Sequence, residues 1–416
     1  MTPPQPTEST TDYTASAGVS PAQPGTAPAE VASTAGIATI PPTVPGSAAR
    51  AVLAVVGIIL LSLVTLFVAV YLVAGLGVNA FAIGGIMALI PLAIVFFGVR
   101  WIDKWEPEPR AAVVFAFLWG AGVSVLLALL VGAEIDNVIT SMGGPGPGYE
   151  FFAAAIQAPI VEEFGKGLGV LIIFWAARRH FDGPVDGIVY AAWVAGGFAF
   201  TENILYFGSQ LVEAGGVDGS VVQIFLVRGI MSPFAHVMFT AFVGIALGIA
   251  ARRSSALGAI GYFILGLIPA ILLHAFWNGA LYFVSNFFGY YVLVQVPLFI
   301  GAIGLVVFFR RQESKLTHDR LAEYAAAGWF DPEEVNVIAT PTGRRQALAW
   351  ARSRGKRAEM KRYLQAATRL AFARQRIITG RGRRTAEADE ALLLTTVVDY
   401  RRALASDGSA ASTQPV

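Results

Sequence analysis

The run AVLAVVGIILLSLVTLFVAVYLVAG, residues 51–75, contains no charged residue. About 20 apolar residues in a helix cross a bilayer core of about 30 Å, so this run is long enough to span a membrane. The whole chain of 416 residues has the same character, since 55% of its residues are hydrophobic and 14% are charged. Soluble domains carry roughly 25% charged residues. The sequence therefore predicts an integral membrane protein.

Seven similar runs follow the first and predict an all-α fold, a polytopic membrane bundle of about eight transmembrane helices. Only Leu76, Gly77 and Val78 separate the first two runs, which predicts a tight hairpin. The expected spans are 51–75, 79–100, 111–133, 151–177, 187–208, 221–250, 257–284 and 287–309.

The loops between these spans sort by charge, because Lys and Arg occur only on alternate connections. Positive residues favour the cytoplasmic side, so the pattern predicts an even number of spans with both termini cytoplasmic. The basic connections carry Arg50, Arg100, Lys104, Arg110, Arg178, Arg179, Arg252, Arg253, Arg310 and Arg311. The opposite connections carry Glu134, Asp136, Glu150, Glu213 and Asp218.

The remaining segments divide the chain into three expected regions. Residues 1–49 are rich in Pro, Thr, Ser, Ala and Gly and predict a disordered cytoplasmic tail, before the transmembrane bundle at 50–310. Residues 311–416 predict a basic, helical cytoplasmic tail. Arg far outnumbers Lys and no organelle signal is evident, so we expect a multi-pass protein of a bacterial cell membrane.

The tail is strongly basic, with fourteen Lys or Arg and one acidic residue, Glu359, in the range 344–384. Tyr363, Ala367, Leu370 and Ala371 follow a helical spacing there. Two interpretations stay open: a solvated helix pair, or contact with anionic lipid of the inner leaflet. We expect no nucleic-acid partner, because no recognised nucleic-acid-binding fold accompanies the charge. The chain has no cysteine, which excludes disulfides and thiol nucleophiles.

Several spans contain ionisable side chains, each of which costs roughly 2.5–3.5 kcal/mol at the bilayer centre on insertion scales. Four helices carry them at overlapping depth, and Lys166 is spaced to pair with either Glu162 or Glu163. Single residues such as Asn203 or Arg228 are usually contacts between helices. The combination of histidines and glutamates at one level favours a functional site. The candidate residues are Glu162, Glu163, Lys166, Glu202, His236, His274 and Asn278.

Three spacings in these spans resemble the motifs of the PrsW family of intramembrane proteases, which is distantly similar to the CAAX prenyl endopeptidases. They are Glu162-Glu163-x-x-Lys166, Phe198-x-x-x-Glu202 and His274-x-x-x-Asn278. The resemblance covers about residues 85–285 and extends to the Trp105–Pro109 loop and to Asp186-Gly187. The third motif of the family more often ends in Asp, so Asn278 departs toward the CAAX relatives.

The resemblance implies an intramembrane endopeptidase that cleaves a membrane-anchored protein, such as an anti-sigma factor. Glu163 or Glu162 would then act as the general base, and His274, with His236 or Asn278, would stabilise the oxyanion or orient water. Lys166 would hold the second glutamate ionised, and Glu202 would complete the pocket. The cofactor stays open between none and zinc; the expected metal ligands are Glu163, Glu202, His236 and His274.

Two other functions stay open at this point. Buried Glu and His residues also serve as relay or binding groups in a proton- or ion-coupled transporter, although the sequence shows no clear internal symmetry. A membrane scaffold acting through its basic tail would leave the intramembrane polar residues unexplained.

Overall fold

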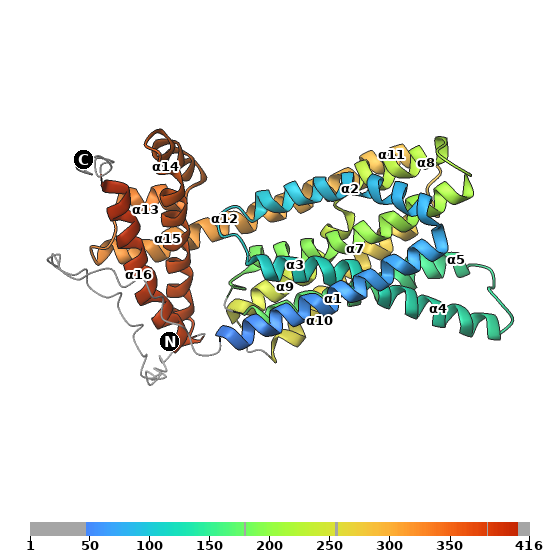
Figure 1. Ribbon diagram of the computed structural model, residues 1–416, viewed down its shortest axis with the longest axis horizontal. Helices are drawn as coiled ribbons and strands as arrows, with labels where there is room; N and C mark the ends of the chain where they lie inside the picture. The colour runs from blue at the N-terminus through green and yellow to red at the C-terminus, as the bar shows by residue number, and fades with distance from the viewer. Residues whose placement is uncertain (1–46, 179, 254–256, 381, 407–416) are drawn as a thin grey trace, which may run out of the picture.

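A computed structural model of the protein describes residues 47–178, 180–253, 257–380 and 382–406, and all regular structure within them is helical (Figure 1). Most of the predicted N-terminal tail therefore lies outside the described residues. The membrane bundle contains α1 (Ser47–Leu76), α2 (Val78–Ile102), α3 (Arg110–Leu118), η1 (Trp119–Ser124), α4 (Val125–Ser141), α5 (Tyr149–Phe152), η2 (Ala153–Gln157), α6 (Ala158–Ala176), α7 (Pro184–Glu213), α8 (Gly219–Ile224), η3 (Phe225–Met231), α9 (Ala235–Arg253), α10 (Ala259–Ala280), α11 (Phe287–Tyr290) and η4 (Tyr291–Gln295), where η marks a π-helical segment. The chain ends with α12 (Val296–Ala326), α13 (Pro332–Ala339), α14 (Pro341–Ser353), α15 (Arg357–Ile378) and α16 (Arg383–Ala405).

The predicted all-α membrane bundle is confirmed. Seven helical stretches are long and apolar enough to cross a membrane, and each overlaps one predicted run. They are Val52–Leu76, Val78–Ile102, Arg110–Ser141, Pro184–Glu213, Gly219–Arg253, Ala259–Ala280 and Phe287–Ala326. The eighth predicted run is also helical, from α5 to α6, but α6 carries three charged residues, Glu162, Glu163 and Lys166, within five positions. It packs against α4, α7, α9 and α10.

The predicted hairpin between the first two helices is also confirmed. Helix α1 ends at Leu76 and α2 begins at Val78, so Gly77 alone makes the turn. Its φ of 80° lies in the left-handed region, which glycine enters without the steric cost of a Cβ.

Helix α7 forms the centre of the bundle, and 78% of its most apolar stretch is buried. It meets α9 where Gly187 faces Gly244, and a Cβ on Gly187 would lie 1.9 Å from the carbonyl oxygen of Gly244. Small residues of this kind let membrane helices approach to backbone contact. The close approach fixes α7 and α9 relative to each other, and these helices carry Glu202 and His236.

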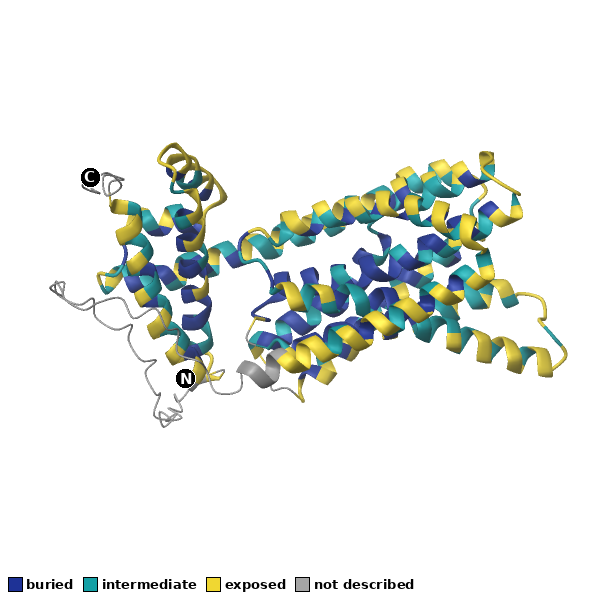
Figure 2. Cartoon of the chain, in the orientation of Figure 1, coloured by how far each residue is buried: buried dark blue, intermediate teal, exposed yellow. Residues whose placement is uncertain are grey.

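The outer helices expose apolar side chains instead of burying them. Leu53 and Phe67 of α1 are 69% and 59% exposed, and Figure 2 shows exposed residues along much of this helix. Buried residues gather on α7 and its neighbours (Figure 2). A lipid-facing surface has this distribution, because hydrocarbon tails solvate apolar side chains.

The C-terminal helices form a second cluster at one end of the bundle (Figure 1). Helix α12 runs without a break from the bundle into this cluster. The expected domain boundary between residues 310 and 311 therefore falls within α12. Tyr363, Ala367, Leu370 and Ala371, which follow the predicted helical spacing, are all buried in the core of this cluster. The apolar side of α15 therefore packs against protein and is not available for insertion into lipid.

Two contacts between an arginine and an acidic side chain join this cluster to the bundle. Arg376 Nη1 lies 2.9 Å from Asp182 Oδ2, and Arg369 Nε lies 3.5 Å from Glu106 Oε1. The acidic partners lie in the loops that precede α7 and α3.

Candidate active site

Helix α6 contributes three adjacent charged residues to the interior of the bundle. Pro159 lies in its first turn, directly after the π-helical η2, and because proline has no N–H it removes one backbone donor from this continuous helical run. Lys166 Nζ lies 2.6 Å from Glu163 Oε1 and 3.5 Å from Glu162 Oε2. The side chains of Lys166 and Glu163 are completely buried, whereas that of Glu162 is 10% exposed. The sequence spacing allowed Lys166 to pair with either carboxylate; in the structure it contacts both, and Glu163 is the closer partner.

Glu163 is held by two further helices. His274 Nδ1 of α10 donates to Glu163 Oε1 at 2.9 Å, and Thr240 Oγ1 of α9 donates to Oε2 at 2.8 Å. Both oxygens of Glu163 are thus engaged. Within the described part of the chain, Glu162 makes its polar contacts through Oε2 alone, to Lys166 and at 3.9 Å to His274 Nε2.

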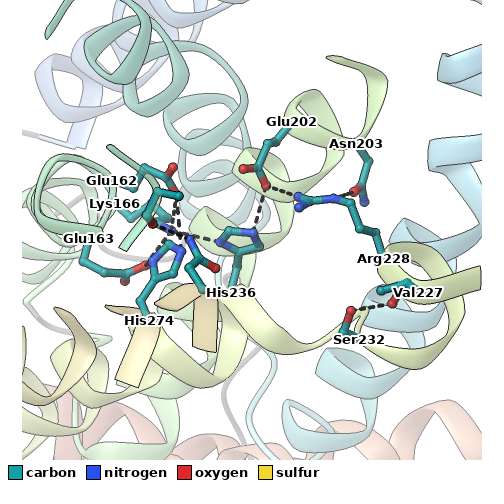
Figure 3. Close-up of polar contacts among 12 residues, drawn as sticks. Glu162, Glu163, Lys166, Glu202, Asn203, Val227, Arg228, Ser232, His236 and His274 are labelled. Carbon is teal, nitrogen blue, oxygen red and sulfur yellow. Dashed lines mark hydrogen bonds and ion pairs between the residues drawn. The ribbon is translucent and has the colours of Figure 1, made fainter. Parts of the chain in front are cut away.

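His236 joins this group to a second carboxylate (Figure 3). Its Nε2 donates to Glu202 Oε2 at 2.8 Å, while its Nδ1 lies 3.1 Å from Lys166 Nζ. Glu202 also pairs with Arg228 Nη2 at 2.5 Å, and Arg228 Nε donates to Asn203 Oδ1 at 3.3 Å. Six of the seven predicted site residues therefore form one connected polar network.

Aromatic rings enclose the network. The ring of Phe239 stacks on that of His274 with centroids 4.6 Å apart, and Lys166 Nζ lies 4.3 Å from the ring centroid of Phe198. The two histidine rings are perpendicular, with centroids 5.3 Å apart. These apolar neighbours lower the local polarity and strengthen the electrostatic interactions within the network.

Glu162, His236 and His274 form a compact group of possible metal ligands. Each offers one ligand atom, and the three atoms lie within 4.8 Å of one another. Lys166 Nζ contacts both His236 Nδ1 and Glu162 Oε2, so this point favours a positive charge.

Comparison with known proteins places the chain in a family. Residues 108–302 match the model of the PrsW family intramembrane metalloprotease. Protease PrsW of Bacillus subtilis (strain 168) is 30% identical over 204 residues, which cover 49% of this chain and 84% of that protein. The chain belongs to the PrsW family. The family suggested by the three sequence motifs is thereby confirmed.

Two other PrsW relatives align over a smaller share of their length. Protease PrsW of Clostridioides difficile (strain 630) is 32% identical over 38% of this chain and 62% of that protein. For Protease PrsW of Geobacillus kaustophilus (strain HTA426) the identity is 34%, over 35% of this chain and 57% of the relative. The chain thus spans less than two thirds of the length of these two relatives. No solved structure matches the chain significantly.

The ligand group suits the metal that the PrsW family description implies. Two imidazoles and one carboxylate, with an open position, are a donor set found in catalytic zinc sites. Metal-binding histidines usually donate their other ring nitrogen to a carboxylate, which fixes the ring and its tautomer. Both histidines have this support, His274 from Glu163 and His236 from Glu202.

This arrangement differs from the expected metal set. The sequence argument grouped Glu163 and Glu202 with the histidines as ligands, whereas both carboxylates bind the outer nitrogens of the histidine rings. Glu162 instead shares the compact group with His236 and His274. The adjacent side chains of Glu162 and Glu163 point about 100° apart around the helix, and only tertiary packing decides which one faces the histidines' free nitrogens.

Asn278 lies outside the network. Its Nδ2 donates to the carbonyl oxygen of Ala154 at 3.0 Å, which ties α10 to the π-helical η2. In contrast, sequence reasoning missed Thr240 and treated Arg228 only as a contact between helices. The available signals were the spacing of Thr240, one turn after His236 on α9, and the presence of an arginine in an apolar span.

Proposed function

We propose that this chain is an intramembrane protease that hydrolyses a peptide bond in a membrane-anchored protein. The observation that carries the proposal is the buried group of Glu162, His236 and His274, in which each histidine is oriented by a second carboxylate. Family membership supports hydrolysis over the alternative of an ion-coupled transporter.

The proposal includes a zinc ion held by Glu162, His236 and His274. Such an ion, when bound, supplies Lewis-acid chemistry, because it polarises a carbonyl group and lowers the pKa of a bound water. The donor types fit, and in the present arrangement Lys166 Nζ is the cation that contacts two of these residues.

The residues around this group each have a distinct role. Glu163 accepts a hydrogen bond from the Nδ1–H of His274, which leaves Nε2 of that ring with its lone pair. Glu202 does the same for Nε2 of His236 and leaves Nδ1 as the acceptor. Lys166 balances the negative charge of Glu162 and Glu163, and Arg228 balances that of Glu202. The network therefore keeps both imidazoles neutral. In each ring, the nitrogen that carries no proton can donate its lone pair to a metal, as metal ligation requires.

The orientation of Glu162 gives it a further possible part in the reaction. Its Oε1 is not engaged by another described side chain, whereas both oxygens of Glu163 are. Of the two adjacent glutamates, Glu162 is therefore the one with an oxygen that can accept a hydrogen bond from water, while its Oε2 faces Lys166 and His274. Glu163 is a positioning residue that acts through His274.

The substrate proposed is a single-span membrane protein, for which an anti-sigma factor is the expected class. Apolar outer helices and bacterial relatives support a bacterial cell membrane as the location. We propose that both termini are cytoplasmic, since the Lys- and Arg-bearing loops all lie on alternate connections.

Reconstitution of the full chain in vesicles with candidate single-span anti-sigma factors tests the proposal. We expect cleavage within the substrate span by the wild type, loss of cleavage with a chelator, and recovery on adding zinc. His274→Ala is the inactive control. Cleavage that persists at full rate in the chelator would contradict the zinc site, and full activity of His274→Ala would contradict the assignment of the active site.

A further inference from the structure

A second site lies at the junction of the bundle and the C-terminal helices. A cavity of about 1040 Å³ opens between the end of α2, the loop that follows it, α12, and helices α14 and α15. It is separate from the network of Glu162 and His274, none of whose residues line it.

The bundle side of this cavity carries four basic residues and one acid. Arg100 and Lys104 come from the end of α2 and the next loop, and Arg310 and Arg311 come from α12. Asp103 is the one acidic residue among all of the residues that line the cavity. Arg100, Lys104 and Arg311 are exposed, so their charges face open space.

The C-terminal helices supply four more basic residues, Arg344, Arg345, Arg357 and Lys361. They belong to the fourteen Lys and Arg of the range 344–384. The lining of the cavity thus contains eight basic residues and one acidic residue. Buried Glu313, on α12, interacts with Arg310 and Arg344 and offsets part of this charge. The remaining excess of positive charge requires an anionic occupant or a high local concentration of counterions.

The cavity is built to hold its basic groups in place. Arg344 is 6% exposed; its Nε donates to the carbonyl oxygen of Ile338 at 2.5 Å and its Nη2 donates to Thr368 Oγ1 at 2.6 Å. Its guanidinium lies 4.1 Å from the ring centroid of Trp105. Burial lowers the pKa of Arg344 to about 10, which leaves it charged at neutral pH.

The position of the cavity selects a lipid over a soluble anion. It lies where the apolar parts of α2 and α12 end, beside Trp101, which is 49% exposed. Tryptophan is enriched at the level of the lipid headgroups. Phe97 and Phe308 on the adjoining helix surfaces are 69% and 52% exposed, which gives acyl chains an apolar surface next to the basic cavity.

We propose that this cavity binds the phosphate headgroup of an anionic phospholipid, with the acyl chains along α2 and α12. The basic tail then has features of both interpretations that its sequence left open. Its apolar residues pack in the core of the C-terminal helices, while four of its basic residues line the cavity in which the headgroup would bind.

Binding of phosphatidylglycerol and phosphatidylcholine to the delipidated full chain in neutral detergent tests this proposal. We expect the wild type to bind phosphatidylglycerol at least about tenfold more tightly, because a basic residue near a membrane surface contributes about a factor of five to anionic lipid binding. Arg345→Gln with Lys361→Gln removes two exposed basic residues of the cavity and should weaken this binding about 30-fold.

Arg352→Gln with Arg362→Gln is the matched control, because both residues are exposed on the same two helices but do not line the cavity. We expect a change of less than about threefold. Arg311→Gln, on α12, is a second variant if the first pair does not fold. Equal binding of the two lipids, or equal effects of the two pairs, would overturn the proposal. Binding of free glycerol phosphate as tight as that of phosphatidylglycerol would also overturn it and assign the cavity to a soluble anion.

Discussion

Replacing Glu163 by Gln separates the charge of this side chain from its shape. Glutamine can still accept a hydrogen bond from His274 and meet the hydroxyl of Thr240, so these two contacts survive as hydrogen bonds to a neutral side chain. The ion pair with Lys166, which joins Nζ to Oε1 at 2.6 Å with both side chains completely buried, does not survive.

The size of the effect follows from what remains beside Lys166. Removing one partner of a buried ion pair typically costs about 3–5 kcal/mol, because the other charge stays buried. Here Glu162 remains 3.5 Å from Lys166 and retains part of the attraction. We therefore expect a loss of about 2–3 kcal/mol in the free energy of unfolding, well above the ~0.6 kcal/mol average of a hydrogen bond between membrane helices.

Thermal unfolding of the purified protein in detergent measures this loss, and zinc titration gives an independent readout. Loss of the carboxylate that accepts a hydrogen bond from a metal-binding histidine typically weakens metal binding about 10–100-fold. The zinc affinity of Glu163→Gln should therefore be about 10–100-fold lower than that of the wild type. Glu150→Gln is the control, since Glu150 is an exposed residue near the start of the same helical run. An unchanged unfolding midpoint together with unchanged zinc affinity would refute the reasoning.

Three further predictions test other parts of the protein. His274→Ala should lower the rate of substrate cleavage at least about 10²–10³-fold, because it removes both a candidate metal ligand and the partner of Glu163, and a smaller loss contradicts the site. The chain has no cysteine, so a single introduced cysteine can report its side of the membrane; Met142 and Leu257 are 78% and 79% exposed. Met142→Cys should react with an impermeant maleimide on intact cells, whereas Leu257→Cys should react only after lysis. The reverse pattern contradicts the predicted orientation. Burial, reinforced by the nearby Asp182, raises the pKa of Glu106 from 4.5 to about 8. The folded protein then holds a proton that the unfolded chain releases, so the unfolding midpoint should fall as pH rises from about 5 to 8, and Glu106→Gln should reduce this slope.

The sequence by itself determined the class of fold and the level of the site. Helical spans are local properties, since each depends on about 20 consecutive apolar residues, and the run from residue 51 to 75 predicts its helix without knowledge of any neighbour. Placing a charged side chain in such a run costs free energy, so several of them at one depth indicate a functional site. That argument found Glu162, Glu163, Lys166, Glu202, His236 and His274, which the structure joins in one network.

Only the tertiary structure decided what each of these residues faces. The sequence grouped Glu163 and Glu202 as metal ligands with the histidines. A metal ligand and the carboxylate that supports it lie only a few ångströms apart, however. The rotation and axial position of four helices set that difference, through contacts such as the one between Gly187 and Gly244. The same packing turns Asn278 toward Ala154 and brings Arg344 over Trp105, residues far apart in the chain. No local pattern encodes these distances, because each depends on how separate helices fit together.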